Sequence, residues 1–127
     1  MPRRMINDII AGRAVVNATP ELTVRAASRM MVDNHIGALL VMQGGRIAGI
    51  FTDGDLRRAI DHNQDINQAT LSQVMTRNCL AISKNILAAE ALGLMEEKKI
   101  TALVVEDDAH HPIGVIHMHD ILRAGII

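Results

Sequence analysis

The sequence predicts an α/β (α+β) fold made of two βαββα repeats, and three observations support this prediction. A glycine-led apolar segment runs directly into a helix start at residues 49–60, and the same pattern recurs at residues 114–125. The two segments begin 65 residues apart. A continuous apolar run, typical of a strand buried on both faces, precedes each of them at residues 36–42 and 100–105.

The first half of the chain contains one strand–helix–strand–strand–helix series after a short lead-in. Thr19 and Pro20 are typical of the N-cap and first position of a helix, and apolar residues at helical spacing continue it to about Asn34. The glycine-rich residues 43–46 predict a hairpin turn. The predicted elements are a lead-in at 6–10, a strand at 14–18, a helix at 19–34, strands at 36–42 and 47–51, and a helix at 52–60.

The second half repeats this series after the polar residues 61–70, which are rich in Asn and Gln. Its predicted elements are a lead-in at 71–76, a strand at 79–82, a helix with its apolar stripe between 86 and 95, strands at 100–105 and 113–116, and a helix start within 117–125. The sequence therefore predicts a first repeat at residues 1–62, a linker at 63–70 and a second repeat at 71–127.

The size of one repeat predicts that the two repeats depend on each other. A unit of about 60 residues is too small to cover a three-stranded sheet that is apolar on both faces. Two repeats packed sheet to sheet, with pseudo-twofold symmetry, would complete a common core. Ligand clefts are then expected between the repeats, where strand ends meet helix starts.

The composition argues against several classes of function. The chain of 127 residues has a formal net charge of −1, so it has no basic field that would recruit nucleic acid or a membrane surface. Phe51 is the single aromatic residue, which argues against the stacking platforms of single-strand nucleic-acid binders. No apolar run approaches the roughly 18 residues that span a bilayer. The basic residues 1–5 are not followed by the apolar stretch of a signal peptide.

Cys79 is the only cysteine, so an intramolecular disulfide is impossible and a reducing compartment is expected. Together with the missing signal peptide, this predicts a cytoplasmic protein. We expect Cys79 to lie in a buried strand, where a thiol is inert. The sequence contains no nucleophile elbow, phosphate-binding loop, dinucleotide fingerprint or zinc-protease motif, so we expect no catalysis by this chain.

Thr52 and Asp55 fit two roles at the start of the helix at 52–60. Their spacing predicts a capping box, which stabilises a helix by about 1 kcal/mol and needs no ligand. The same helix start would also offer free N–H groups and a positive dipole to a phosphate. The sequence leaves both roles open.

His117 and Asp120 occupy the equivalent positions in the second repeat. Because a neutral histidine is a poor cap, we expect His117 to be half-exposed without a role, or to contact phosphate, more strongly when protonated. His117 and His119 would share one face of a strand. The chain lacks the ligand spacing of a zinc site, so we expect no metal.

Arginines follow both helix starts within the first turns. Arg57, Arg58 and Arg123 are either solvated surface residues, or Arg58 and Arg123 reach a phosphate through charge-assisted hydrogen bonds. Four apolar positions are expected in the core and would alternatively line a base pocket without aromatic side chains: Val15, Val16, Leu80 and Ile82.

Several short motifs recur in matching places: Gly-Ile-Phe-Thr-Asp-Gly-Asp at 49–55, Gly-Val-Ile-His-Met-His-Asp at 114–120, Ile-Gly-Ala-Leu at 36–39, Ile-Thr-Ala-Leu at 100–103 and Val-Met-Thr at 74–76. As a set they resemble a tandem pair of CBS domains, also called a Bateman module. The resemblance covers about residues 6–127.

This resemblance implies a regulatory module that requires no cofactor and binds AMP, ADP, ATP or a related ligand such as a CMP-sugar. Asp55 and the equivalent Asp120 would accept hydrogen bonds from ribose hydroxyls. Because His117 replaces threonine, occupancy of the second site is left open. The ligand-site residues that the resemblance implies are Val16, Thr19, Gly37, Ala38, Thr52, Asp53, Asp55, Arg58, Thr76, Leu80, Ile82, Thr101, Ala102, His117, His119, Asp120 and Arg123.

The segments at 49–58 and 117–125 also resemble the C-terminal portion of bacterial arabinose-5-phosphate isomerases, which feed Kdo and lipopolysaccharide synthesis. That resemblance implies a sugar-isomerase domain as partner, in cis if the chain is a fragment or in trans if it is a free-standing regulator. A homodimer through the helices is also expected, without nucleic acid or membrane partners. The alternative is an architectural role in which the module only dimerises and binds no ligand.

Overall fold

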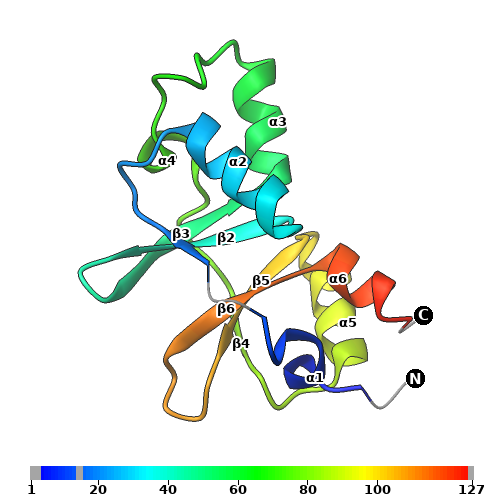
Figure 1. The fold of residues 1–127 in the computed structure, drawn as a ribbon. Helices are drawn as coiled ribbons and strands as arrows, with labels where there is room; N and C mark the ends of the chain where they lie inside the picture. The colour runs from blue at the N-terminus through cyan, green and yellow to red at the C-terminus, as the bar shows by residue number, and fades with distance from the viewer. Residues whose placement is uncertain (1–3, 14–15, 126–127) are drawn as a thin grey trace. The chain divides into compact units, whose positions relative to one another are not determined.

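The structure, a computed structural model, describes residues 4–13 and 16–125, and it divides into two compact units. We call residues 16–79 the central unit and residues 4–13 with 80–125 the terminal unit. Each unit contains one three-stranded sheet with helices beside it (Figure 1). The α+β class and the repeated βαββα series are confirmed, and the packing of one sheet on the other stays a prediction.

The central unit contains β1 (Asn17–Ala18), α2 (Val24–Asn34), β2 (Ala38–Gln43), β3 (Arg46–Thr52), α3 (Asp53–Asp61) and α4 (Leu71–Val74). In its sheet, β1 runs parallel to β2, and β2 runs antiparallel to β3. Gly44 and Gly45 form the predicted hairpin turn, and both have the positive φ that glycine adopts readily. Of the strand predicted at 14–18, residues 14 and 15, including Val15, lie outside the described residues.

The terminal unit contains α1 (Ile6–Ile10), β4 (Ala81–Ser83), α5 (Ala88–Lys98), β5 (Ala102–Glu106), β6 (Pro112–His117) and α6 (Met118–Arg123). Its sheet has the same strand directions as the central sheet. Leu103 pairs with Ile116, as Leu39 pairs with Phe51 in the central unit. The duplication therefore extends to the register of the strands. No helix in the described ranges is long and apolar enough to cross a bilayer.

Each unit has its own apolar core. In the central unit, Leu39, Val41 and Phe51 alternate along the strands and pack with α2 and α4. In the terminal unit, Leu103 and Ile116 pack with α1, α5 and α6. The central core contains Ala18, Val24, Ala27, Met31, Leu39, Val41, Phe51, Ala69, Leu71 and Met75, and the terminal core contains Ile6, Ile82, Ala88, Ala91, Met95, Leu103, Val105, Ile116 and Ile121.

The lead-in helix α1 packs in the terminal unit, although the sequence predicts it in the first repeat. The backbone N–H groups of Ile6 and Asn7 donate to the carbonyls of Ile86 and Lys84, both at 2.9 Å. The Ile6 side chain is fully buried in the terminal core. The lead-in of the first repeat is therefore built into the second.

The second lead-in helix, α4, makes the reciprocal contacts in the central unit. The N–H groups of Leu71 and Ser72 donate to the carbonyls of Leu22 and Pro20, both at 2.9 Å. Leu71 is fully buried, as Ile6 is in the terminal unit. Since the lead-ins are exchanged, the compact units do not coincide with the predicted repeats. The repeat boundaries at residues 62 and 71 stay a prediction.

Helix α2 begins later than the sequence predicts. Its N-cap is Thr23, whose hydroxyl accepts from the N–H of the third helical residue at 3.2 Å. Thr19 opens a turn instead, and its carbonyl accepts from Leu22 at 3.2 Å. The loop before α4 explains the difference, because the carbonyl of Ala69 accepts from the N–H of Val24 at 2.9 Å and fixes the first turn there.

The segment after α4 lies against β3 at a position that requires glycine. Ile50 and Thr76 form an antiparallel bridge with two backbone hydrogen bonds of 2.9 Å. A Cβ on Gly49 would lie 2.5 Å from the Thr76 carbonyl oxygen, much closer than any normal contact. At the equivalent Gly114, no atom of the described residues lies within 4 Å of such a Cβ. The two glycines are therefore expected to tolerate substitution differently.

We expect Gly49→Ala to lower the free energy of unfolding by about 2–3 kcal/mol, because the added methyl group displaces the Thr76 backbone. The matched control, Gly114→Ala, is expected to change stability by less than about 1 kcal/mol and to favour folding slightly, because alanine suits a strand better than glycine. Urea unfolding followed by circular dichroism measures both. Equal effects of the two substitutions would contradict the close approach at Gly49.

The turn between β5 and β6 is organised by the carboxylate of Asp107. One carboxylate oxygen accepts from the N–H groups of Ala109 at 3.0 Å and His111 at 2.8 Å. These hydrogen bonds, that to His111 first, hold the pKa of Asp107 below its ordinary value. A carboxyl whose folded pKa is depressed stabilises the fold above its unfolded pKa of about 3.9 and loses this effect as the pH falls through the folded value.

The substitution Asp107→Asn tests this pH dependence. The wild type should be more stable than the variant at neutral pH, and the difference should disappear as the pH falls from about 4 towards 2, where the carboxyl is protonated. Urea unfolding at a series of pH values measures the difference. A difference that stays constant down to pH 2 would show that the charge of Asp107 has no part in the turn.

Candidate functional site

The junction between β3 and α3 is a capping box built from Thr52 and Asp55. The Thr52 hydroxyl accepts from the N–H of Asp55 at 3.1 Å, and the Asp55 Oδ2 accepts from the N–H of Thr52 at 2.9 Å. Both residues are buried. The capping role predicted from the sequence is confirmed, and it places a carboxylate inside the start of the helix.

The second oxygen of Asp55 has two further partners. Its Oδ1 accepts from the Arg58 guanidinium at 2.5 Å and from the Thr76 hydroxyl at 3.0 Å. Thr76 belongs to the segment after α4, so the exchanged lead-in supplies one partner of the buried acid. The N–H of Asp53 donates to the carbonyl of Gly37 at 3.1 Å, which ties the helix start to the residue before β2.

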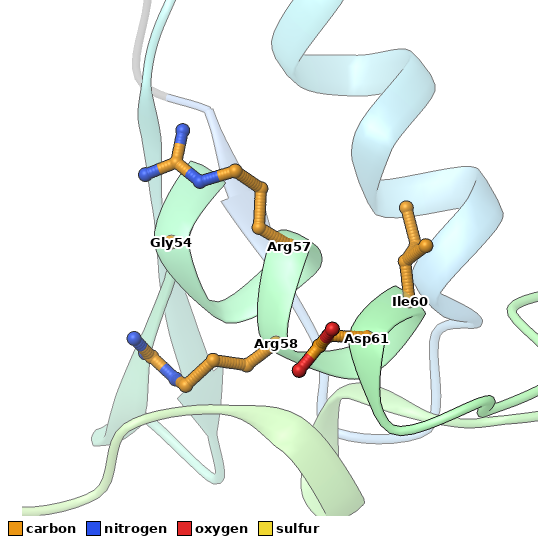
Figure 2. Close-up of a pocket in the computed structure, with 5 residues that line it drawn as sticks. All are labelled: Gly54, Arg57, Arg58, Ile60 and Asp61. Atoms are coloured by element: carbon orange, nitrogen blue, oxygen red, sulfur yellow. The ribbon is translucent and has the colours of Figure 1, made fainter.

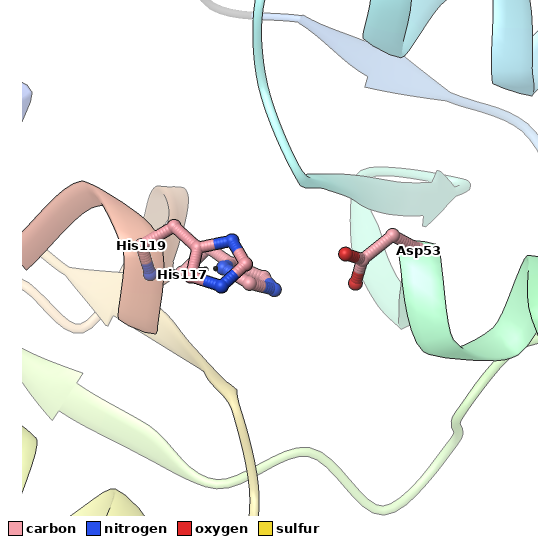
Figure 3. Close-up of side chains that lie close together, drawn as sticks. All are labelled: Asp53, His117 and His119. Atoms are coloured by element: carbon pink, nitrogen blue, oxygen red, sulfur yellow. Dashed lines mark hydrogen bonds between the residues drawn. The ribbon is translucent and has the colours of Figure 1, made fainter.

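The junction between β6 and α6 is also capped, which corrects the expectation for His117. His117 is buried, and its Nδ1 accepts from the N–H of His119 at 3.1 Å. Its own N–H donates to Asp120 Oδ2 at 2.8 Å. The prediction of a half-exposed, non-capping histidine is wrong, because an unprotonated ring nitrogen supplies the lone pair that a cap needs. The rings of His117 and His119 lie 4.7 Å apart between centroids (Figure 3).

Asp120 is held by two arginines. Its Oδ1 accepts from Arg123 at 2.7 Å and lies 3.2 Å from one nitrogen of Arg13, whose other nitrogen lies 3.5 Å from Oδ2. Arg13 follows α1, so here too an exchanged lead-in contacts the buried acid. Arg13 is not predicted from the sequence, because no local motif surrounds it and its partner lies 107 residues away.

The structure brings several other predicted residues next to the two junctions. Ala38 pairs with Thr52 and Ala102 pairs with His117 at the ends of the sheets. The carbonyl of Thr101 accepts from the N–H of Met118 at 2.7 Å, as Gly37 does for Asp53. The ligand-binding roles of these residues stay predictions.

Four predicted residues have other surroundings. Val16 packs on the central core and Ile82 is part of the terminal core, as the core interpretation expects. Leu80 is partly exposed and its carbonyl accepts from the N–H of Val104 at 2.9 Å. Among the described residues, no hydrogen bond joins Thr19 to Thr52 or Asp55; the Thr19 carbonyl accepts from the N–H of Leu22 instead. The ligand-binding roles of these four residues stay predictions.

A shallow hollow lies on the solvent side of α3 (Figure 2). It is lined by Gly54, Arg57, Arg58, Ile60 and Asp61. The Arg57 and Arg58 side chains are 76% and 63% exposed, and Arg57 lies 3.8 Å from the Asp53 carboxylate. Two exposed guanidiniums thus lie on the helix that contains Asp55, each beside a carboxylate of its first turn.

Cys79 lies in the connection before β4, not in a buried strand as the sequence predicts, and its side chain is half-buried. Its thiol donates to the Thr76 carbonyl at 3.3 Å. Burial raises the pKa of Cys79, the negative charge of Asp55 raises it further, and hydrogen bonding to the Ile50 backbone opposes both. The thiol is therefore held protonated and is a poor nucleophile.

Residues 6–62 and 71–126 both match the CBS domain, so the chain belongs to the CBS domain family and contains two copies of it. The resemblance stated from the sequence is confirmed. Crystal structures of the CBS domain protein NE2398 (TM-score 0.84, 26% identity, 98% of each chain covered) and of ATU1752 from Agrobacterium tumefaciens (0.81, 26%, 96% of this chain and 98% of that one) are similar.

The chain is also similar to curated isomerases. It is 44% identical over 120 residues to arabinose 5-phosphate isomerase KdsD of Pseudomonas aeruginosa, covering 94% of this chain and 34% of that protein. It is 38% identical over 124 residues to KdsD of Escherichia coli K12, covering 96% and 38%. The chain therefore spans little more than a third of the length of these relatives, and the matched part is the CBS region.

We expect Thr76→Val to lower the free energy of unfolding by about 1 kcal/mol, because the buried Asp55 carboxylate loses a hydroxyl donor. Thr76→Ser keeps this donor and is the matched control, with an expected change below about 0.5 kcal/mol. Urea unfolding of the two variants measures the difference. If valine and serine are equally well tolerated, the hydrogen bond to Asp55 contributes nothing to folding.

Proposed function

We propose that this chain is a non-catalytic regulatory module that binds a phosphorylated, ribose-containing ligand at the β3–α3 junction. An adenine nucleotide or a nucleotide-sugar fits this description. The observation that carries the proposal is the combination, at one helix start, of the buried Asp55 carboxylate with two exposed guanidiniums.

Asp55 suits a ribose hydroxyl because its carboxylate is fixed and not fully used. A carboxylate has about four acceptor positions. Among the described residues, Thr52, Arg58 and Thr76 use three of them. Oδ2 keeps a position for a ligand hydroxyl, and the exposed Thr76 hydroxyl can give up another. The capping bonds hold the acid in place, so binding would require the groups that cover it, Arg58 and Thr76, to move aside.

Arg57 and Arg58 suit the phosphate. Both side chains extend from the middle of α3 beside the hollow shown in Figure 2. The N-terminus of α3 adds the positive end of its dipole. Hydrogen bonds between guanidinium and phosphate are about twice as strong as neutral ones. Nucleotides with more phosphate groups should therefore bind more tightly than adenosine.

The fold is compatible with this class of ligand. The CBS domain pair of protein MJ0100 was solved in complex with 5′-methylthioadenosine and S-adenosyl-L-methionine (TM-score 0.80, 22% identity, 98% of this chain and 97% of that one). At this identity the likeness concerns the fold alone. The ligand proposed for the present chain rests on its own Asp55, Arg57 and Arg58.

We further propose that ligand binding modulates a sugar-phosphate isomerase, with the isomerase domain in cis or in trans. The matches to KdsD support this partner. Burial raises the pKa of the Cys79 thiol, which agrees with a chain that does not use this cysteine as a nucleophile. This chain alone is therefore expected to leave ribulose 5-phosphate and arabinose 5-phosphate unconverted.

A second candidate function is dimerisation without a ligand. Val32 on α2 is 65% exposed and Ile60 on α3 is 55% exposed, which is unusual for large apolar side chains. The two helices are neighbours in the central unit (Figure 1). A homodimer through these helices would cover both side chains.

Calorimetric titration with AMP, ADP, ATP, CMP-sugars and adenosine tests the proposed ligand. Asp55→Asn should weaken binding at least about tenfold, equivalent to about 1.4 kcal/mol. The reason is that asparagine lacks the negative charge that strengthens the hydrogen bond from the ligand hydroxyl. Asp107→Asn is the matched control and should bind like the wild type. Arg57→Gln and Arg58→Gln should weaken ATP more than adenosine.

The result that would overturn the proposal is no binding of any of these compounds at millimolar concentration. Light scattering of the same samples separates the two candidate functions. A dimer that is stable and indifferent to every ligand would favour the architectural role.

A further inference from the structure

The two buried acids differ in the number of cations that contact their oxygens. Asp120 accepts hydrogen bonds from the N–H of His117, from Arg123 and, at 3.5 Å, from one nitrogen of Arg13. A second nitrogen of Arg13 lies 3.2 Å from its Oδ1. Asp55 also accepts three hydrogen bonds among the described residues, but only one of them comes from a guanidinium. The acid of the terminal unit is therefore held by one more cation than Asp55.

The difference comes from the exchanged lead-in segments. After α4, the segment presents the neutral hydroxyl of Thr76 to Asp55 at 3.0 Å. After α1, it presents the guanidinium of Arg13 to Asp120 at 3.2 Å. Arg13 is 31% exposed and Asp120 only 3%, so the ion pair closes over a buried carboxylate. An arginine placed there competes with any ligand hydroxyl for the same oxygens.

We propose that Arg13 is a specificity-determining residue that makes the two CBS junctions unequal. Arg13 occupies Asp120 and keeps it from ligand hydroxyls, so the ligand binds at Asp55 first and reaches Asp120 only by displacing Arg13. The choice of ligand rests on the function proposed above, whereas the contact itself rests on the geometry of the terminal unit.

This arrangement has a second consequence. When Arg13 is displaced, the lead-in that contains α1 loses its side-chain contact with Asp120. Occupancy of the second junction is thereby coupled to the contacts of this lead-in. Because Arg13 is partly exposed, salt weakens the ion pair and should narrow the difference between the junctions.

Calorimetry with ATP on the full chain tests the inequality. The wild type should show a stronger binding event that Asp55→Asn removes. In Arg13→Gln, a second event should appear or strengthen about fivefold, and adding Asp120→Asn should remove it. The matched control is Arg46→Gln, an exposed arginine with no ion pair among the described residues, and it should leave both events unchanged.

The outcomes separate this inference from the proposed function. If ATP binds at Asp55 and Arg13→Gln neither adds nor strengthens an event, the role of Arg13 is refuted alone. If Arg13→Gln binds through Asp120 while the wild type binds nothing, the role of Arg13 stands and the assignment to Asp55 fails. No binding by any variant contradicts both.

A double-mutant cycle without ligand tests the contact directly. Arg13→Gln and Asp120→Asn should each raise the unfolding equilibrium constant, and their combined effect should depart from additivity at least threefold. The cycle of Arg46→Gln with Asp120→Asn should be additive. Additivity in both cycles would show that Arg13 does not hold Asp120, and this would overturn the proposal.

Discussion

The exchange of the two lead-in helices is the constraint on which the structure depends. Ile6 and Leu71 occupy equivalent, fully buried positions, and each belongs to the core of the other repeat. Neither repeat can complete its core from its own consecutive residues. Removing such a side chain from a core costs about 2–5 kcal/mol, a large part of the stability of a small domain. Each compact unit is therefore built from residues of both repeats.

The same exchange builds the candidate site. The segments that follow α1 and α4 each end beside a buried aspartate at a strand-to-helix junction. In each unit one carboxylate, Asp55 or Asp120, caps a helix and contacts the lead-in segment. The same carboxylate is the proposed contact of the ligand. A group that already has structural partners is well suited to regulation, because a ligand that takes over some of those partners alters the contacts of the lead-in.

Much of the fold follows from periodicity in the sequence. The glycine-led segments at 49 and 114 and the apolar runs before them give the strands, the hairpin and the duplication, because a buried three-stranded sheet imposes these patterns. The box of Thr52 and Asp55 was also predictable, since its spacing is set by the helix itself.

Other features depend on contacts that a local pattern does not contain. Thr19 and Pro20 have the composition of a helix start, yet the carbonyl of Ala69 fixes that start four residues later. His117 caps its helix because its buried ring keeps a lone pair, which residue type alone does not reveal. The partner of each lead-in, and with it the role of Arg13, is set by tertiary packing across most of the chain.

The position of residues 4 and 124 has a mechanical consequence. The Arg4 guanidinium donates to the carbonyl of Ala124 at 3.3 Å, so the chain enters and leaves through the terminal unit. A domain joined at either side would be tethered to that unit alone. A signal from the proposed ligand site at Asp55 would therefore have to travel from the central unit to the terminal unit to reach such a domain.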